Sequence, residues 1–287
     1  MTNVVNMDHP DPESVPVRDA ATVMLLRQGG DGLEVCMLQR NLNSDFVGGA
    51  YVFPGGAVDP GDGAPEVAAL CLGRSDAEAS AAIDLPAGGL AFWVAAIRES
   101  FEEAGLLMAI DEAGELVSFE DEVVADRFLV HRRAVDNGER PLVEIAVEEH
   151  LLLAVDRIHY FSRWITPLGA PRRYDTRFFI AHPPEFQVPV HDDHEVIANL
   201  WIRPSDALAR HEAGEFELIF PTVRSLEALA TFDTAEQIVA HAASIGEVHP
   251  VLPTIVDGEH GMRIVLPSDR VDDTDQVYDA ATSKRIS

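Results

Sequence analysis

The sequence has very little positive charge and almost no lysine. Its 287 residues include 21 Lys+Arg against 49 Asp+Glu, for a formal net charge of −28 at pH 7, and Lys284 is the only lysine. General binding to nucleic acid or to an anionic membrane depends on Lys and Arg side chains that neutralise phosphates. The charge balance argues against both functions. It leaves room for a small anionic ligand that a metal ion and a few arginines neutralise locally. Whether the acidity reflects genome composition or a high-salt environment stays open.

Cysteine and long apolar runs are scarce as well. Cys36 and Cys71 are the only cysteines, which excludes a disulfide framework and indicates a reducing, cytoplasmic environment. Cys36 lies in an apolar strand pattern and is interpreted as a core residue, not as a nucleophile. No apolar run approaches the ~20 residues of a membrane-spanning helix. The first residues lack the basic and apolar regions of a signal peptide, so we expect no membrane association.

The most informative stretch is acidic and helical. Residues 95–107 read AAIRESFEEAGLL, which places Glu99, Glu102 and Glu103 on one helix face at i, i+3 and i+4. Such a face is most often only solvated. Like charges this close repel each other, however, and a divalent cation that prefers oxygen ligands would offset the repulsion. Arg98 beside them has a planar fork suited to a carboxylate or a phosphate.

A glycine turn upstream completes a motif with the acidic helix. Residues 51–59 read YVFPGGAVD, in which Pro54 ends a short strand and Gly55 and Gly56 allow a close backbone approach. A Pro-Gly-Gly turn alone is weak evidence. Together, the turn and the helix resemble the Nudix box, G-x5-E-x7-R-E-U-x-E-E-x-G-U, where U is a bulky aliphatic residue. This box is the signature of the Nudix hydrolases.

The resemblance has three departures. Asp62 stands at the first Glu of the box, and Ser100 stands at a bulky aliphatic position. Residues 63 to 97 separate the two halves where the box has x7, which we interpret as an insertion that leaves turn and helix intact. The split box is similar to a long-insert subgroup of Nudix hydrolases that includes a peroxisomal coenzyme A diphosphatase. The similarity continues to about residue 230.

The resemblance implies a metal-dependent active site. The implied ligands for Mg²⁺ or Mn²⁺ are Glu99, Glu102, Glu103 and the carbonyl of Gly56. Arg98 would orient the carboxylates, and Glu102 would act with them in catalysis. The general base differs among members of the family, so two candidates stay open, Glu103 first and Glu195 second.

Other polar and aromatic residues are candidates for contacts with the substrate. Those for binding substrate phosphate are Arg40, Arg172 and Arg173, with Asp175 to orient one of them. Trp164 and Phe178 are suited to stacking on adenine, although aromatic residues in strands most often belong to the core. Residues 191–195 read HDDHE, which favours a solvated loop over a second metal site because neighbouring side chains point in different directions.

Hydrophobic periodicity predicts an α+β fold, and the resemblance specifies a Nudix-type α/β/α sandwich with a mixed sheet and a helical insertion. We expect a flexible N-terminal tail at 1–16 and a single domain at 17–267. Within the domain, the helical insertion spans about 63–89 and a second helical block spans about 120–155. Residues 268–287 are expected to form a polar C-terminal tail.

The expected function is hydrolysis of the diphosphate bond in a nucleoside diphosphate derivative. Coenzyme A or acyl-CoA, cut to 3′,5′-ADP and (acyl-)4′-phosphopantetheine, is the substrate that the subgroup implies. Two alternatives stay open: an ADP-ribose, dinucleotide or NADH pyrophosphatase, and a ligand-binding protein of the same fold without turnover. The small molecule is the expected partner, with a homodimer as an analogy from the family.

Overall fold

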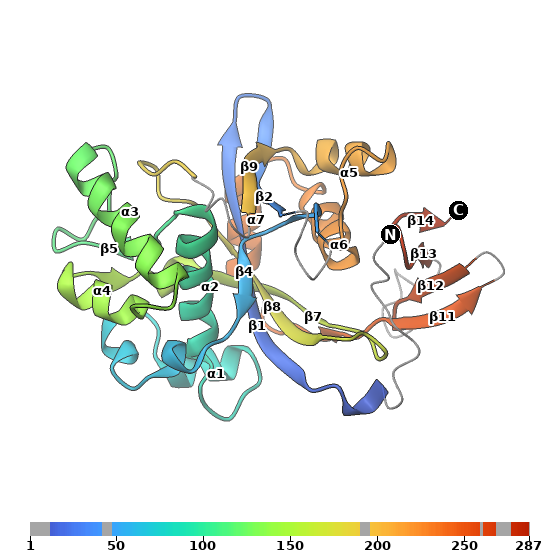
Figure 1. The fold of residues 1–287 in the computed structure, drawn as a ribbon, viewed down its shortest axis with the longest axis horizontal. Coiled ribbons are helices and arrows are strands. Elements are labelled where there is room, and N and C mark those ends of the chain that lie inside the picture. Colours follow the sequence, from blue (N-terminus) through green and yellow to red (C-terminus); the bar gives the residue numbers. More distant parts are fainter. Residues whose placement is uncertain (1–11, 42–47, 190–195, 259–260, 268–276, 287) are drawn as a thin grey trace.

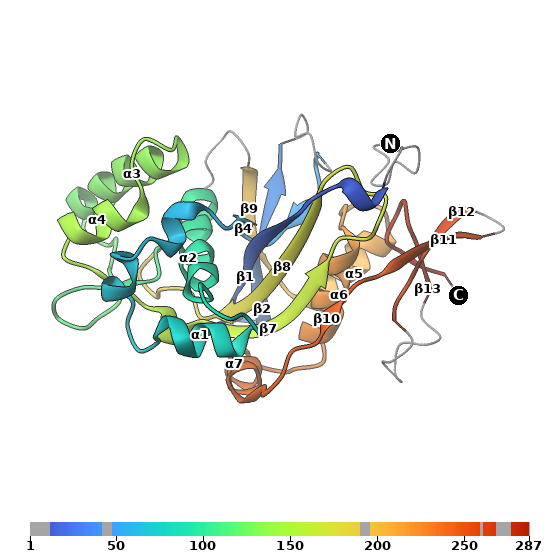
Figure 2. The same cartoon turned by 90° about the horizontal axis from the view of Figure 1, so that it is seen from below.

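The computed structural model of the protein describes residues 12–41, 48–189, 196–258, 261–267 and 277–286. A mixed sheet forms its centre, with helices on both faces (Figures 1 and 2). The strands of this sheet are β1 (Val17–Gly29), β2 (Gly32–Arg40), β3 (Tyr51–Val52), β4 (Gly55–Ala57), β7 (His159–Ile165), β8 (Arg173–Ala181), β9 (Val196–Ile202) and β10 (Pro250–Val251). Their order is β10-β7-β8-β1-β2-β3, with β4 paired to β1 and β9 paired to β2. The sheet is mixed because β1 runs parallel to β8 and antiparallel to β2.

Helices cover the sheet in two layers. On one side lie α1 (Asp76–Ala82), α2 (Leu90–Ala104), α3 (Glu122–Asp136) and α4 (Leu142–Glu148), and on the other lie α5 (Pro204–Glu212), α6 (Phe220–Leu229) and α7 (Ala235–Ser244). A small ladder of β5 (Ala109–Ile110) and β6 (Leu152–Leu153) lies beside α3 and α4. The predicted α/β/α sandwich is confirmed. Within the described ranges, no helix is both long enough and apolar enough to cross a membrane.

Strand β1 shows why the sheet needs helices on both faces. Val23 and Leu25 belong to the core cluster that contains α2, whereas Met24 and Leu26 belong to the cluster that contains α5, α6 and α7. All four side chains are buried. Because successive residues of a strand point to opposite faces, a continuous apolar run can be buried only between two layers.

Helix α2 ends at a glycine. Gly105 follows it in the left-handed conformation, with φ of 69°, and closes the helix with backbone bonds to Phe101 and Ser100. The Ser100 hydroxyl donates to the carbonyl of Leu106 at 2.9 Å and is fully buried. The serine at a normally aliphatic position therefore fixes the turn that ends the helix.

The insertion is attached to the start of α2. Its helix α1 begins with a capping box in which Ser75 and Glu78 bond to each other's backbone N–H groups. Asp76 then accepts the N–H groups of Gly88 at 2.9 Å and Leu90 at 3.0 Å. The segment at 64–72, which reads as a helix in the sequence, forms only the short 3-10 helix η3 (Val67–Leu70).

Residues 277–286 belong to the stretch expected to form a polar tail, but they contain two strands. Residues 277–286 contribute β13 (Val277–Asp279) and β14 (Arg285–Ile286) to a second sheet, with the order β11-β12-β13-β14, whose other strands are β11 (Thr254–Gly258) and β12 (Gly261–Val265). Tyr278 is fully buried, and its ring lies 4.9 Å from that of Phe220. Its hydroxyl accepts a bond from Arg224 at 2.7 Å. One buried aromatic residue thus anchors this segment to α6.

Replacing Tyr278 tests this anchor. Tyr278→Ala leaves a cavity beside Phe220 and should lower the free energy of unfolding by about 3–5 kcal/mol. Tyr278→Phe keeps the ring and loses the hydroxyl bonds to Arg224 and Glu227, so it should cost only about 1 kcal/mol. Urea unfolding followed by circular dichroism measures both. An alanine variant as stable as the phenylalanine variant would mean that the ring does not hold this sheet in place.

Candidate active site

Helix α2 presents its acidic face to the glycine turn at β4. Arg98, Glu99 and Glu103 are buried, with 8%, 8% and 6% of their surfaces exposed, and Glu102 is half-buried. Ordinary surface glutamates keep their carboxylates in water. The acidic face of this helix is therefore part of a site and is not a solvated surface.

Arg98 gathers the acidic groups. Its Nε and Nη2 donate to the two carboxylate oxygens of Asp62 at 2.9 and 3.0 Å. Its Nη1 donates to Glu99 Oε1 and to Glu102 Oε2, each at 2.8 Å, and Nη2 also donates to the carbonyl of Ala57 at 2.7 Å. These bonds use the whole planar fork, which a lysine ammonium would not reproduce.

Asp62 fills the position of the first box glutamate despite its shorter side chain. It lies in the 3-10 helix η2 (Pro60–Gly63), where its Oδ2 also accepts the N–H of Asp59 at 2.8 Å. Asp62 is 4% exposed and forms a two-point pair with Arg98, 36 positions along the chain. The insertion between them leaves turn and helix in contact, as interpreted from the sequence.

The glycine turn lies in close contact with the carboxylates of Glu99 and Glu103. The N–H of Gly55 donates to Glu103 Oε2 at 2.9 Å. A Cβ atom built on Gly56 would lie 2.4 Å from Glu99 Oε1. A side chain at this position would displace Glu99, because real Cβ contacts are not this short. Gly56 is thus required by the close approach of α2, and Gly55 by that of β1, where an added Cβ would lie 2.6 Å from the carbonyl oxygen of Ala21.

The site carries more negative charge than its arginine offsets. Asp59, Asp62, Glu99 and Glu102 all lie within 4.0 Å of the Arg98 guanidinium. Burial raises the pKa of Glu99 to about 7 and that of Glu102 to about 8, against the opposing effect of Arg98. Burial also raises the pKa of Asp62. Ionised carboxylates are costly here unless further positive charge is bound.

The residues fit a divalent cation in their chemistry, although they do not yet surround one. In the described part of the chain, no three His, Cys, Asp or Glu side chains already form a group able to hold a metal ion. The reason is that Arg98 holds Glu99 and Glu102, while Gly55 holds Glu103. Hard divalent cations take oxygen ligands, and excess buried negative charge favours binding one.

Helix α3 supports the catalytic helix in a way that the sequence did not indicate. Arg132 is buried and donates to the backbone carbonyls of Glu102 at 2.9 Å and Glu103 at 3.1 Å. A cation near the C-terminus of a helix is favoured by the helix dipole. Asp136, one turn further, lines the same cavity as Glu102. Long-range contacts of this kind have no signal in local sequence pattern.

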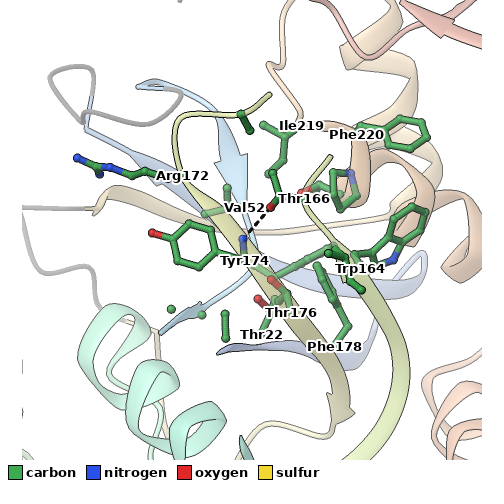
Figure 3. A pocket seen from close by; sticks show the side chains of 18 of the residues that line it. Thr22, Val52, Trp164, Thr166, Arg172, Tyr174, Thr176, Phe178, Ile219 and Phe220 are labelled. Atoms are coloured by element: carbon green, nitrogen blue, oxygen red, sulfur yellow. Dashed lines mark hydrogen bonds between the residues drawn. The ribbon is translucent and has the colours of Figure 1, made fainter. Parts of the chain in front are cut away.

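A cavity of about 480 Å³ opens beside the carboxylates. Charged, uncharged polar and apolar side chains line it; Figure 3 shows Arg172 and Tyr174 on one side and Trp164, Phe178 and Phe220 on the other. The charged lining residues are Arg40, Glu99, Glu102, Glu103, Asp136 and Arg172. This volume lies in the range of sites that bind small molecules.

The strand β8 separates the arginines expected to bind phosphate. Residues 172, 174, 176 and 178 line the cavity, so by alternation Arg173 belongs to the opposite face. Arg173 is buried and donates from Nε to the carbonyl of Thr166 at 3.2 Å. Of the three arginines predicted to bind substrate phosphate, Arg40 and Arg172 thus line this cavity, whereas Arg173 does not.

The other candidates for the site were Asp175, Trp164, Phe178 and Glu195. Asp175, expected to orient Arg172 or Arg173, instead pairs with Arg163 at 2.6 Å and with Arg177 at 3.2 Å. Trp164 and Phe178 line the cavity and are also largely buried, with 7% and 6% of their surfaces exposed. Glu195 and the rest of 191–195 lie outside the described residues.

Comparisons with known proteins agree with this geometry. The family model of the NUDT19 Nudix domain matches residues 72–229, more than half of the chain. The chain belongs to this Nudix family. It is 26% identical to the acyl-coenzyme A diphosphatase NUDT19 of Gallus gallus, over 91% of this chain and 81% of that protein. It is 27% identical to the Homo sapiens protein of the same name, over 84% of this chain and 72% of that protein.

A solved Nudix structure supports the same conclusion. The crystal structure of a NUDIX hydrolase from Alicyclobacillus acidocaldarius superposes with a TM-score of 0.66 at 27% identity, covering 79% of this chain and 97% of that one. The fold, the box residues and the family match all indicate that this protein is a Nudix hydrolase. Divalent metal ions are the general cofactors of Nudix hydrolases.

Gly56 allows a test of this Nudix site without disturbing the fold. Gly56→Ala pushes the flexible carboxylate end of Glu99 aside, so stability should change little while kcat falls by about 10²-fold, the usual effect of misplacing a catalytic group by an ångström. Gly61→Ala is the matched control, because nothing lies within 4 Å of its added Cβ. Steady-state kinetics and thermal melting measure the two effects. Equal activity in the two variants would contradict the assigned contact.

Proposed function

We propose that this Nudix hydrolase cleaves the diphosphate bond of coenzyme A or acyl-CoA. The products are 3′,5′-ADP and 4′-phosphopantetheine, or its acyl thioester. The observation that carries the proposal is that the carboxylates of α2 share one cavity with Arg40, Arg172 and a large apolar surface. In acyl-CoA the diphosphate joins a nucleoside to a pantetheine arm that ends in an apolar acyl chain, which matches this combination of charged and apolar lining. The names of the related acyl-coenzyme A diphosphatases support this choice of substrate.

The metal ligands in this proposal are the three α2 carboxylates and a backbone oxygen. Glu99, Glu102 and Glu103 would hold Mg²⁺ or Mn²⁺ together with the carbonyl of Gly56. When bound, the cation would neutralise charge on the diphosphate and make a nearby water molecule more acidic. Arg98 keeps Glu99 and Glu102 turned toward each other through its bonds at 2.8 Å. Arg98 thereby prepares the donor set before the ligand arrives.

Glu103 is the proposed general base. Its Oε2 is fixed by the N–H of Gly55 at 2.9 Å, in the turn that lines the cavity. Glu103 takes a proton from water as the water oxygen bonds to one phosphorus. The bond from that phosphorus to the bridging oxygen breaks, and the second phosphate leaves with that oxygen. Glu195, the second choice from the sequence, remains an alternative base.

Arg40 and Arg172 are proposed to bind phosphate oxygens of the substrate. Both line the cavity that holds the carboxylates, and arginine binds phosphate through a planar pair of N–H groups. Their positive charge would also compensate for the strongly acidic chain at the point where an anion binds. We further propose a cytoplasmic location, in keeping with the free thiols of Cys36 and Cys71, and a homodimer by analogy with the family.

Glu103→Gln tests the chemistry directly. Removing the base should lower kcat for CoA by about 10²–10⁴-fold, with little change in melting temperature because glutamine keeps the size of the side chain. Glu66→Gln, at an exposed carboxylate in the insertion, is the control and should keep wild-type activity. Release of 3′,5′-ADP, measured by chromatography with Mg²⁺ and with Mn²⁺, gives both rates.

The same assay should include ADP-ribose, NADH and diadenosine polyphosphates. Faster cleavage of one of these than of CoA and acyl-CoA would replace the proposed substrate and retain the hydrolase. Wild-type activity in Glu103→Gln would remove Glu103 from the mechanism. Binding of a panel compound by the wild type without any turnover would favour the non-catalytic alternative.

A further inference from the structure

The second sheet forms one wall of the active-site cavity. Pro253, Ile255, Ile264, Ala280 and Ser283 all line it, and they come from the region of β11 to β14. The family model ends at residue 229, so this wall lies outside the matched Nudix domain. A segment outside the matched domain that reaches the active site is a good candidate for selecting the substrate.

Three aromatic rings and one short strand connect this wall to the rest of the cavity. The ring of Trp164 on β7 lies 5.7 Å from that of Phe220 at the start of α6, at 89°. Phe220 in turn lies 4.9 Å from Tyr278 on β13. Strand β10 pairs with β7 through Val251 and Trp164, just before the second sheet begins. The wall is thus fixed to the strand that carries Trp164.

The cavity is apolar where this wall closes it. The large apolar side chains that line it from β7, β8, α6 and the second sheet include Trp164, Phe178, Phe220, Pro253, Ile255 and Ile264. None of the charged lining residues comes from these segments, since they lie on α2, α3, β2 and the loop before β8. In Figure 3, Trp164 and Phe220 lie on the side of the cavity away from Arg172. The cavity therefore has a charged part and an apolar part.

We propose that the apolar part is a subsite for the acyl chain of acyl-CoA, and that Ile255, Ile264 and Ala280 set its depth. This inference rests on the proposed function and names the part of the substrate that these residues bind. An adenine ring would bring several donors and acceptors to this part of the cavity, where unpaired polar groups are costly. Its polar lining side chains are uncharged, namely the hydroxyls of Thr166, Tyr174, Thr176, Thr222 and Ser283 and the indole of Trp164, and the Thr166 hydroxyl already accepts the N–H of Tyr174 at 3.0 Å. An alkyl chain needs no such partners, and its transfer from water is favourable for each methylene buried.

The test compares octanoyl-CoA with CoA in three proteins: the wild type, Ala280→Phe and Ala281→Phe. Ala280 lines the cavity, so a phenylalanine there fills the subsite, whereas Ala281 is exposed and serves as the matched control. Dissociation constants are measured by calorimetry with EDTA present, so that no turnover occurs, and kcat/KM is measured with Mn²⁺. Thermal melting checks that each protein is folded.

The wild type and Ala281→Phe should prefer octanoyl-CoA by about tenfold or more, the scale on which a hydrophobic pocket discriminates small apolar groups. Ala280→Phe should reduce this preference to about one, because the added ring occupies the space of the acyl chain. If Ala280→Phe does not fold, Ile255→Ala takes its place and should lower the preference by about threefold through lost contact.

Failure of this inference can be told apart from failure of the proposed function. Cleavage of CoA by a wild type that has no preference for the octanoyl group overturns the subsite and retains the function. An unchanged preference in Ala280→Phe also overturns it. A wild type that neither binds nor cleaves either compound overturns the proposed function, and the subsite with it.

Discussion

The pairing of Arg98 with Asp62 is the interaction on which the rest of the active site depends. It joins the glycine turn to helix α2 across the insertion, through two hydrogen bonds of 2.9 and 3.0 Å between buried groups. The same guanidinium holds Glu99 and Glu102. Breaking a buried pair by removing one partner leaves an uncompensated charge and typically costs about 3–5 kcal/mol. Position of the carboxylates and stability of the fold are therefore coupled at one residue.

This arrangement leaves an excess of carboxylates over positive charge in the site. One guanidinium faces four carboxylates within 4.0 Å, and burial raises the pKa values of Glu99 and Glu102 to about 7 and about 8. A further cation would favour the ionised forms that bind it. The buried acidic face thus lowers the stability of the protein without a cation and raises its affinity for a positively charged ligand.

Local sequence pattern predicted the parts of the molecule that depend on local physics. The cap of α2 at Gly105 and the β1–β2 hairpin have local causes in glycine placement and hydrophobic period, and the acidic helix and the glycine turn were recognised from the sequence. The parts it missed depend on contacts between distant segments. Arg132 reaches the carbonyls that end α2 from another helix, and Arg173 is separated from Arg172 by strand alternation. Strands β13 and β14 were missed because they are anchored by one buried tyrosine, Tyr278, which packs against the distant Phe220.

Binding of Mn²⁺ to the protein without substrate is the most direct test of a metal site on the acidic face of α2. Electron paramagnetic resonance reports the free ion, so a titration gives the dissociation constant for the wild type and for Glu99→Gln/Glu103→Gln. We expect saturable binding by the wild type and affinity weaker by about tenfold or more in the double variant, because two of three carboxylates are neutralised. Equal affinity in the two proteins, both folded, would contradict a metal site on the acidic face of α2.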